Sequence, residues 1–228
     1  MKIGVIGAGR IGGNAARLLA AAGHDVLLSF SRDPNRLASL AVSIGSRATV
    51  GEVSAAAEFG DVVLFSVPWA LIPAVLDEAG SLEDKIVIDT TNYFARGGGQ
   101  EIPAGLTAAA FNQRRMPGAR VVKAFNTLTS GFQARQAGRP ASERVVLFLA
   151  GDDPAARKTV AGLIEDAGFA PADIGTLAEA APMEAPRRPG AVYGEEYRPA
   201  DAQAVIEALR AGRPIPEAPR YDDAGLRY

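Results

Sequence analysis

The sequence predicts an α/β protein with a doubly wound, mainly parallel sheet. An apolar run at residues 3–6 breaks into glycines and then continues with the periodicity of a helix. Short β-branched runs then alternate with helical patterns as far as Gly175. Such alternation implies right-handed βαβ crossovers, which build a doubly wound sheet.

Three glycines, Gly7, Gly9 and Gly12, follow the first apolar run at G-x-G-x-x-G spacing. Gly7 permits a tight turn, Gly9 lets the backbone approach a pyrophosphate, and Gly12 lets the next helix press onto the strand. Because the motif lies between a predicted strand and a predicted helix, it indicates the dinucleotide site of a Rossmann-type NAD(P)-binding fold. Arg10 and Ile11, inside the motif, are expected to contact the cofactor. The alternative is a glycine-rich loop that holds no ligand.

The other elements follow from periodicity and turn residues. The first helix carries apolar residues at helical spacing and ends at Gly23. Buried parallel strands are continuous apolar runs, and residues 61–67 form such a run, which ends at Pro68. The same criteria predict strands at 25–29, 49–50, 85–90, 120–125, 143–150 and 170–174, and helices at 37–44, 51–59, 69–79, 104–115 and 154–167.

The composition changes after Gly175. Residues 179–199 contain many prolines and charges with little periodicity, which predicts a loop or lid instead of a packed layer. Residues 198–211 have one apolar face and predict a helix, and the prolines of 213–219 exclude regular structure there. We therefore expect an NADP-binding domain over 1–177, with the loop, helix and tail of 178–228 packed on it or on a partner subunit.

Composition excludes several classes of partner and chemistry. Lysine and arginine number 24 against 26 aspartates and glutamates, and the net charge of -2 gives no field for nucleic acid or an anionic membrane. There is no cysteine, and the single histidine, His24, cannot form a His-rich zinc site, so we expect no metal. His24 is expected in an exposed loop. Without a secretory signal or an apolar stretch of bilayer length, the sequence predicts a cytoplasmic protein without membrane insertion.

The end of the second predicted strand indicates which nicotinamide cofactor binds. NAD-binding folds usually place an acidic residue there for the ribose hydroxyls, but this chain has Ser31 and Arg32. A guanidinium and a hydroxyl suit a 2′-phosphate, so the sequence favours NADP over NAD. The alternative is that Ser31 and Arg32 only begin a surface turn, and Asp33 weakens the argument for a phosphate.

Two later motifs, Ser66-Val-Pro-Trp69 and Val122-Lys-Ala-Phe-Asn-Thr127, add to these features. Together they resemble the coenzyme F420-dependent NADP oxidoreductases, and also the cytoplasmic oxidoreductase domains of membrane metalloreductases, over residues 1–175. The resemblance implies hydride transfer between NADPH and a deazaflavin (F420) or flavin ring, and a homodimer. It places the nicotinamide beside the loops after the fourth, fifth and sixth strands, at Val67, Pro68, Thr91, Asn92, Ala124, Phe125 and Asn126.

The chain departs from that family pattern after Gly175. The apolar C-terminal helix that packs the second subunit is not found, and the proline-rich residues 183–198 take its place. This departure affects the second substrate more than the fold.

No constellation of side chains supplies an obvious general acid. Lys123 could contact a ribose or donate a proton, although a lysine at a strand edge is more often solvated. Tyr193 lies between glycines and could fold over a ligand, or belong to a plain linker. Trp69 could form a wall of the pocket or anchor the core. The amide of Asn126 could bind a carboxamide both as a hydrogen-bond donor and as an acceptor.

The missing acid leaves three functions open. Hydride transfer between two flat cofactors needs mainly orientation, because the cofactors carry the chemistry. A first alternative is an NADP-dependent reductase of a small carbonyl or imine, with Lys123 or Tyr193 as the acid. A second alternative is a non-catalytic NADP-binding sensor or partner protein.

Overall fold

The structure is a computed structural model that describes residues 1–31 and 33–221. Eight strands in these ranges form one sheet in the order β3-β2-β1-β4-β5-β6-β7-β8. They are β1 (Lys2–Ile6), β2 (Asp25–Ser29), β3 (Ala48–Val50), β4 (Val62–Phe65), β5 (Ile86–Asp89), β6 (Arg120–Lys123), β7 (Val146–Gly151) and β8 (Ala170–Asp173). The predicted strands are all present, with bounds that differ by one to three residues at most ends.

The sheet is mainly parallel, as predicted. Strands β1 to β6 pair in parallel, and the order reverses between β1 and β4, as in a doubly wound Rossmann-type sheet. Strand β7 pairs with β6 antiparallel through Val122 and Gly151, while β8 pairs with β7 in parallel. The last two strands therefore run opposite to the first six.

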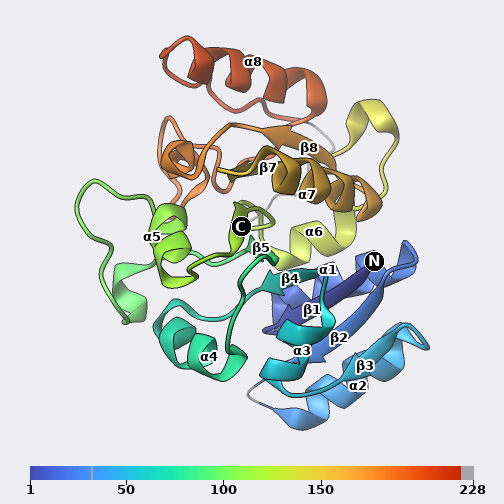
Figure 1. The fold of residues 1–228 in the computed structure, drawn as a ribbon. Coiled ribbons are helices and arrows are strands. Elements are labelled where there is room, and N and C mark those ends of the chain that lie inside the picture. The colour runs from blue at the N-terminus through green and yellow to red at the C-terminus, as the bar shows by residue number, and fades with distance from the viewer. Residues whose placement is uncertain (32, 222–228) are drawn as a thin grey trace.

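Helices cover both faces of the sheet (Figure 1). They are α1 (Arg10–Ala21), α2 (Pro34–Ile44), α3 (Val53–Phe59), α4 (Ile72–Ala79), α5 (Ala108–Arg115), α6 (Ser130–Gln136), α7 (Pro154–Asp166) and α8 (Pro199–Arg210). Short 3-10 turns lie at η1 (Trp69–Leu71), η2 (Ala95–Gly97), η3 (Ala141–Glu143), η4 (Leu177–Glu179) and η5 (Ala181–Met183).

Two hydrophobic cores result, one on each face of the sheet. Alternate residues of one strand point to opposite faces, so Val63 and Phe65 pack with α3, α4, α5 and α8. Their neighbours Val62 and Leu64 pack with α1, α2, α6 and α7. Because both faces are covered, the carboxyl edge of the strands is left as the place for a ligand.

Helices α2, α3 and α4 begin two or three residues from their predicted starts, and two further helices differ more from the prediction. Helix α5 begins at Ala108 instead of residue 104, because the Thr107 hydroxyl accepts the Ala110 N–H at 3.0 Å and caps the helix there. Helix α6 was not predicted. Thr129 caps it through the Phe132 N–H at 3.3 Å, but Gly131 in its first turn weakens the helical pattern of the sequence.

The C-terminal segment is irregular but buried. Residues 184–198 form no helix or strand, so the predicted loop is confirmed. The prediction that the segment would not pack is wrong, because Met183, Val192 and Tyr197 join the first core. The Val146 N–H donates to the Tyr197 carbonyl at 2.9 Å, which fixes the segment against β7. Helix α8 packs beside β8, at the top of Figure 1. Residues 213–221 contain neither helix nor strand, as predicted, whereas the domain division at 177 stays a prediction.

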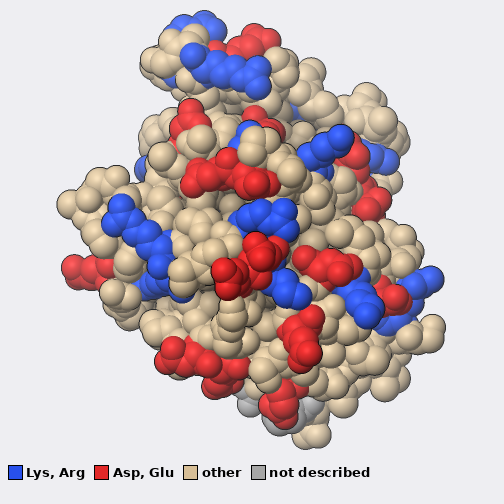
Figure 2. All heavy atoms as spheres, in the orientation of Figure 1, with Lys and Arg blue, Asp and Glu red and all other residues tan. Residues whose placement is uncertain are grey.

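Acidic and basic side chains alternate on the face shown in Figure 2. That face carries no large single-sign patch of the kind that attracts nucleic acid. In the described part of the chain, no helix combines the length and apolarity needed to span a bilayer.

Candidate cofactor-binding site

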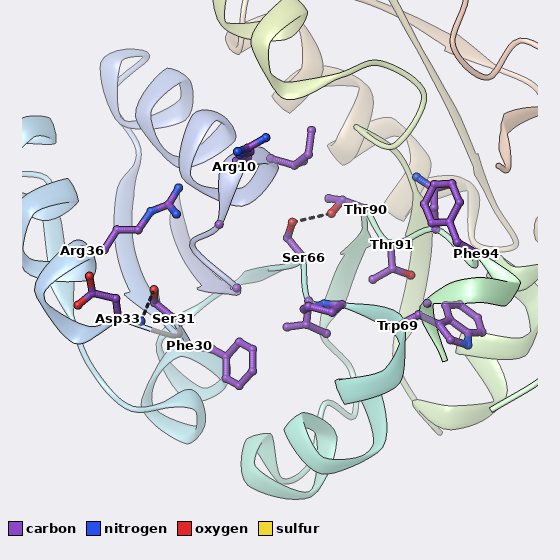
Figure 3. Close-up of a pocket in the computed structure, with 17 residues that line it drawn as sticks. Arg10, Phe30, Ser31, Asp33, Arg36, Ser66, Trp69, Thr90, Thr91 and Phe94 are labelled. Atoms are coloured by element: carbon purple, nitrogen blue, oxygen red, sulfur yellow. Dashed lines mark hydrogen bonds between the residues drawn. The ribbon is translucent and has the colours of Figure 1, made fainter. Parts of the chain in front are cut away.

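A cavity of about 540 Å³ lies at the carboxyl ends of β1, β2, β4 and β5 (Figure 3). This is the point where the strand order reverses, and ligands of open α/β sheets bind there. Its lining is Gly7, Gly9, Arg10 and Ile11 after β1; Phe30, Ser31, Asp33 and Arg36 after β2; Ser66, Val67, Pro68 and Trp69 after β4; and Thr90, Thr91, Asn92, Phe94 and Gly97 after β5.

The three motif glycines occupy different environments. A Cβ on Gly7, whose φ is +102°, would lie 2.4 Å from the Ser66 carbonyl oxygen. A Cβ on Gly12 would lie 2.2 Å from the Gly7 carbonyl oxygen, so α1 packs directly against the loop. A Cβ on Gly9 would meet no atom within 4 Å. Gly7 and Gly12 thus shape the loop, while Gly9 faces open space beside the helix terminus.

The amino terminus of α1 is prepared for an anion. Gly9 is its N-cap and has no side chain to accept the free N–H groups, and the first turn holds no acidic residue. A helix terminus of this kind binds a pyrophosphate through its backbone N–H groups and its dipole. Helix α2 differs, because Asp33 caps it by accepting the Asn35 N–H at 3.0 Å.

The end of the cavity beside β2 has the polar residues expected for an adenosine phosphate. Ser31 lines it, and its Oγ accepts the Asp33 N–H at 3.3 Å. Arg32 lies outside the described residues. Arg36, exposed in the first turn of α2, also lines the cavity and was not predicted. An arginine in the first turn of the helix after β2 is the sequence signal that would have identified it.

The end beside β4 and β5 is mostly uncharged. Trp69 lines it and is only 5% exposed, so this residue is both a cavity wall and a core residue. Its Nε1–H donates to the Gln100 carbonyl at 2.7 Å, and its ring packs on that of Tyr93 at 5.3 Å. Phe94 is half exposed beside it. The described lining from Ser66 to Gly97 contains no Asp, Glu, Lys, Arg, His or Tyr.

The predicted site residues are distributed unequally around this cavity. Gly7, Gly9, Arg10, Ile11, Ser31, Val67, Pro68 and Asn92 line it. Gly12, Ala124, Phe125 and Asn126 do not; the last three are buried just after β6. Asn126 reaches the cavity through Asn92, because its Nδ2 donates to Asn92 Oδ1 at 3.2 Å and to the Met183 carbonyl at 2.7 Å. Contact of these residues with a cofactor stays a prediction.

The two candidate acids lie away from the cavity lining. Lys123 is fully buried, not solvated, because it faces Asp89 in the β5–β6 register and its Nζ pairs with that carboxylate at 3.0 Å. Tyr193 is half-buried in the 183–198 segment, and burial raises the pKa of its phenol. Neither side chain is among the described residues that line the cavity.

The expectation that His24 lies in an exposed loop is wrong. His24 is 8% exposed and lies between the N-terminal ammonium, 3.3 Å from Nδ1, and Asp166, 3.0 Å from Nε2. Its partners are far along the chain, so local sequence gave no sign of this burial. Within residues 1–31 and 33–221, no group of three or more His, Cys, Asp or Glu side chains is placed to hold a metal ion.

Comparison with known proteins agrees with this geometry. A family model described as "NADP oxidoreductase coenzyme F420-dependent" matches residues 2–93. The curated protein "Metalloreductase STEAP3" of Rattus norvegicus is 30% identical over 184 residues, which cover 81% of this chain and 36% of that protein. The chain therefore spans little more than a third of the length of this relative.

Two solved structures resemble the chain over most of its length. A hypothetical protein, SMa0349, from Sinorhizobium meliloti is 31% identical with a TM-score of 0.74, covering 87% of this chain and 95% of its own. A putative F420-dependent NADP-reductase from Arthrobacter sp. FB24 is 27% identical with a TM-score of 0.66, covering 79% and 87%. Family and neighbours support NADP(H) as the cofactor. Residues 2–93 match the family of coenzyme F420-dependent NADP oxidoreductases, and the family resemblance predicted from the sequence is confirmed.

Proposed function

We propose that this protein transfers a hydride between NADPH and a flat redox ring, either deazaflavin F420 or a flavin. The observation that carries the proposal is the absence of ionisable side chains in the described lining from Ser66 to Gly97. A carbonyl or imine substrate needs a proton donor beside its reacting atom. Transfer between two rings needs mainly close, correct orientation, which an uncharged cavity can provide.

The two ends of the cavity indicate the direction in which NADP(H) would lie. Ser31 and Arg36, with Arg32 added by the sequence, would hold the 2′-phosphate, because guanidinium groups and hydroxyls donate to phosphate oxygens. The pyrophosphate would lie over Gly9, where the uncapped N–H groups of α1 are free and a Cβ meets nothing. Arg10 and Ile11 extend this contact. The nicotinamide would then lie beside Ser66, Val67 and Thr91.

The uncharged end also suits a second ring. Pro68, Trp69 and half-exposed Phe94 supply apolar surface there. Aromatic side chains stabilise flat ligands by offset or edge-to-face packing. When bound, NADPH supplies the hydride with its two electrons, and the acceptor ring takes it up. The residues of this chain orient the two rings and exclude water.

Asn126 supports the placement of the nicotinamide. Its Oδ1 is buried and has no hydrogen-bond partner among the described residues. Buried acceptors are normally satisfied. Asn126 does not line the cavity, but it is joined to Asn92, which does, and an N–H donor of a carboxamide that enters beside Asn92 would satisfy this oxygen. Flipping the amide would place its oxygen against the acceptors Asn92 Oδ1 and Met183 O, so the assigned orientation holds. Ala124 and Phe125, the latter at a φ of +59°, set the position of Asn126.

Anaerobic mixing of the purified protein with NADPH tests the proposal. We expect NADPH oxidation with F420 or with a free flavin, and none with a panel of small carbonyls and imines. Turnover of a carbonyl or imine would instead favour the reductase alternative, and binding without any turnover would favour the sensor. Tyr193→Phe is the control variant: the proposal expects an unchanged hydride-transfer rate, whereas a Tyr193 acid requires a large loss.

We also expect the homodimer that the family resemblance implies, and a cytoplasmic location. Analytical ultracentrifugation of the purified chain and fractionation of cells check these two expectations.

A further inference from the structure

A buried polar network lies directly behind the uncharged end of the cavity. Its members are Asp89 on β5, Asn112 and Arg115 on α5, Lys123 on β6, and Thr91 in the loop after β5. Asp89, Asn112 and Lys123 are each 0% exposed. We call this set the Asp89 network. Of its members only Thr91 lines the cavity, so Thr91 is where the network meets a ligand.

The network holds the backbone of Thr91 on both sides. Asp89 Oδ1 accepts the Thr91 N–H at 2.8 Å, and Lys123 Nζ donates to the Thr91 carbonyl. Asp89 Oδ2 accepts from Lys123 Nζ at 3.0 Å and from Asn112 Nδ2 at 2.9 Å. Because a buried charge pair keeps its geometry only when its hydrogen bonds are satisfied, these contacts fix Thr91 in place.

The amide of Asn112 has one possible orientation. Its Oδ1 accepts from Arg115 Nη1 at 3.0 Å, so the atom that faces the Asp89 carboxylate must be the nitrogen. That nitrogen also donates to Thr91 Oγ1 at 3.0 Å. Arg115 is itself held, because its Nη2 donates to Gln100 Oε1 at 3.0 Å and its guanidinium lies 4.6 Å from the centre of the Trp69 ring.

The hydroxyl of Thr91 therefore has a fixed polarity. Since Oγ1 accepts from Asn112, its own proton must point elsewhere, and no described residue accepts it. The neighbouring pair of Thr90 and Ser66, 2.8 Å apart, differs because it joins two hydroxyls that can each donate. Figure 3 shows Thr91 on the same side of the cavity as Thr90 and Phe94. Because Thr91 lines the cavity, its proton is left for a ligand bound there.

We propose that Thr91 donates this hydrogen bond to the carbonyl oxygen of the nicotinamide carboxamide, and that Asn112 is the positioning residue that fixes its direction. The proposal rests on the placement of the nicotinamide end given above. It does not depend on the second substrate. The carboxamide then has its acceptor satisfied by Thr91 and its N–H groups left for acceptors such as Asn126 Oδ1.

A binding cycle with a modified cofactor tests the role of Thr91. NADPH is compared with its thionicotinamide analogue, in which sulfur, a weak acceptor, replaces the carboxamide oxygen. We expect Thr91→Val to weaken NADPH binding about tenfold, since a hydrogen bond is lost, and Thr91→Ser to retain affinity within about threefold. The preference of the wild type for NADPH over the analogue should disappear in Thr91→Val and remain in Thr91→Ser.

Asn112→Asp tests the positioning role. The change keeps the size of the side chain but puts a carboxyl group against the buried Asp89 carboxylate, so one of the two carboxyl groups takes up a proton. That proton is shared between the two carboxyl groups, and the oxygen that then faces Thr91 accepts the Thr91 proton, which turns away from the cavity. We expect the same loss of preference for NADPH over the analogue as in Thr91→Val, and no further loss in the double variant. A purely structural role would lower the unfolding temperature without changing that preference.

The outcomes separate this proposal from the proposed function. An unchanged cofactor preference in a folded Thr91→Val variant overturns it, even if the hydride reaches F420 or a flavin. Loss of the preference supports it, even if no acceptor ring is reduced, because the assay measures binding alone. If Asn112→Asp does not fold, the comparison of Thr91→Val with Thr91→Ser still tests the proposal. A wild type that does not bind NADPH overturns both proposals.

Discussion

The two ends of the cavity are built differently. The end that would hold the adenosine phosphates comes from residues 7–12 and 31–36, two short segments that follow neighbouring strands. The uncharged end depends on contacts between distant residues, such as Asn112 with Thr91, 21 positions apart, and Lys123 with Asp89, 34 positions apart. The difference teaches that local sequence specifies the class of cofactor, whereas the reacting end is assembled by tertiary structure.

Lys123→Met should have the largest effect, because it removes one partner of a buried ion pair behind the uncharged end of the cavity. The carboxylate of Asp89 then remains buried without compensation, which costs about 3–5 kcal/mol of the free energy of unfolding. Denaturant unfolding measures it. Lys158→Met on the exposed face of α7 is the matched control and should change stability by less than about 0.5 kcal/mol. Equal effects of the two changes would show that the ion pair does not hold the uncharged end together.

Two glycine changes at the adenosine-phosphate end of the cavity distinguish a role in the shape of the loop from a role in contact with the cofactor. Gly12→Ala places a Cβ 2.2 Å from the Gly7 carbonyl oxygen, so α1 must move, at a cost of about 1–3 kcal/mol of stability. Gly9→Ala meets no protein atom within 4 Å and should leave the unfolding temperature nearly unchanged. It should nevertheless weaken NADPH binding, because its Cβ enters the space of the pyrophosphate. Calorimetry with and without NADPH measures both effects, and an equally unstable Gly9→Ala would contradict this distinction.

Arg36→Ala tests the phosphate end of the cavity. Losing one charge-assisted bond to the 2′-phosphate should weaken NADPH binding about tenfold and leave NADH binding nearly unchanged. Arg47→Ala is the matched control, since Arg47 is half exposed and pairs with Asp25 at the other end of β2. Fluorescence titration with both cofactors measures the ratio. An equal loss for NADH would place Arg36 away from the phosphate.

Asp33→Asn should have the smallest effect, and in the opposite direction. Asparagine caps a helix about as well as aspartate, so stability should stay within about 0.5 kcal/mol. Removing an exposed negative charge near the proposed phosphate position should tighten NADPH binding by up to about fivefold at low salt. Titration at two salt concentrations checks both points. Weaker binding would mean that Asp33 contacts the cofactor favourably.

The sequence predicted most of the fold because the strands are continuous apolar runs and most helices have a clear apolar face. It missed α6, where Gly131 and few apolar residues obscure the pattern. It also misjudged residues 179–199, because burial of Met183 and Val192 follows no helical or strand period. Irregular segments that pack well leave no periodic signal in a sequence.

The residues of the candidate site also fall into those that local sequence predicts and those that it does not. Gly7, Gly9 and Ser31 were found because each lies at a fixed offset from a predicted strand. Lys123 was considered either a cofactor contact or a solvated lysine, and its buried ion pair was missed, since nothing near it in sequence reveals Asp89 on the neighbouring strand. The Thr91 donor could not be predicted at all, because its polarity depends on Asn112 and Arg115 of a helix that begins later in the chain.

The central claim is that the uncharged end of the cavity brings two rings together for direct hydride transfer. Isotope tracing with NADPH deuterated at the transferring position tests it most directly. The account predicts that deuterium from one face of the nicotinamide appears on the carbon that receives the hydride in F420, or in a deazaflavin analogue used in place of a flavin. It also predicts a primary isotope effect on the single-turnover rate. Deuterium delivered instead to a carbonyl or imine carbon, or found with no acceptor at all, would contradict it.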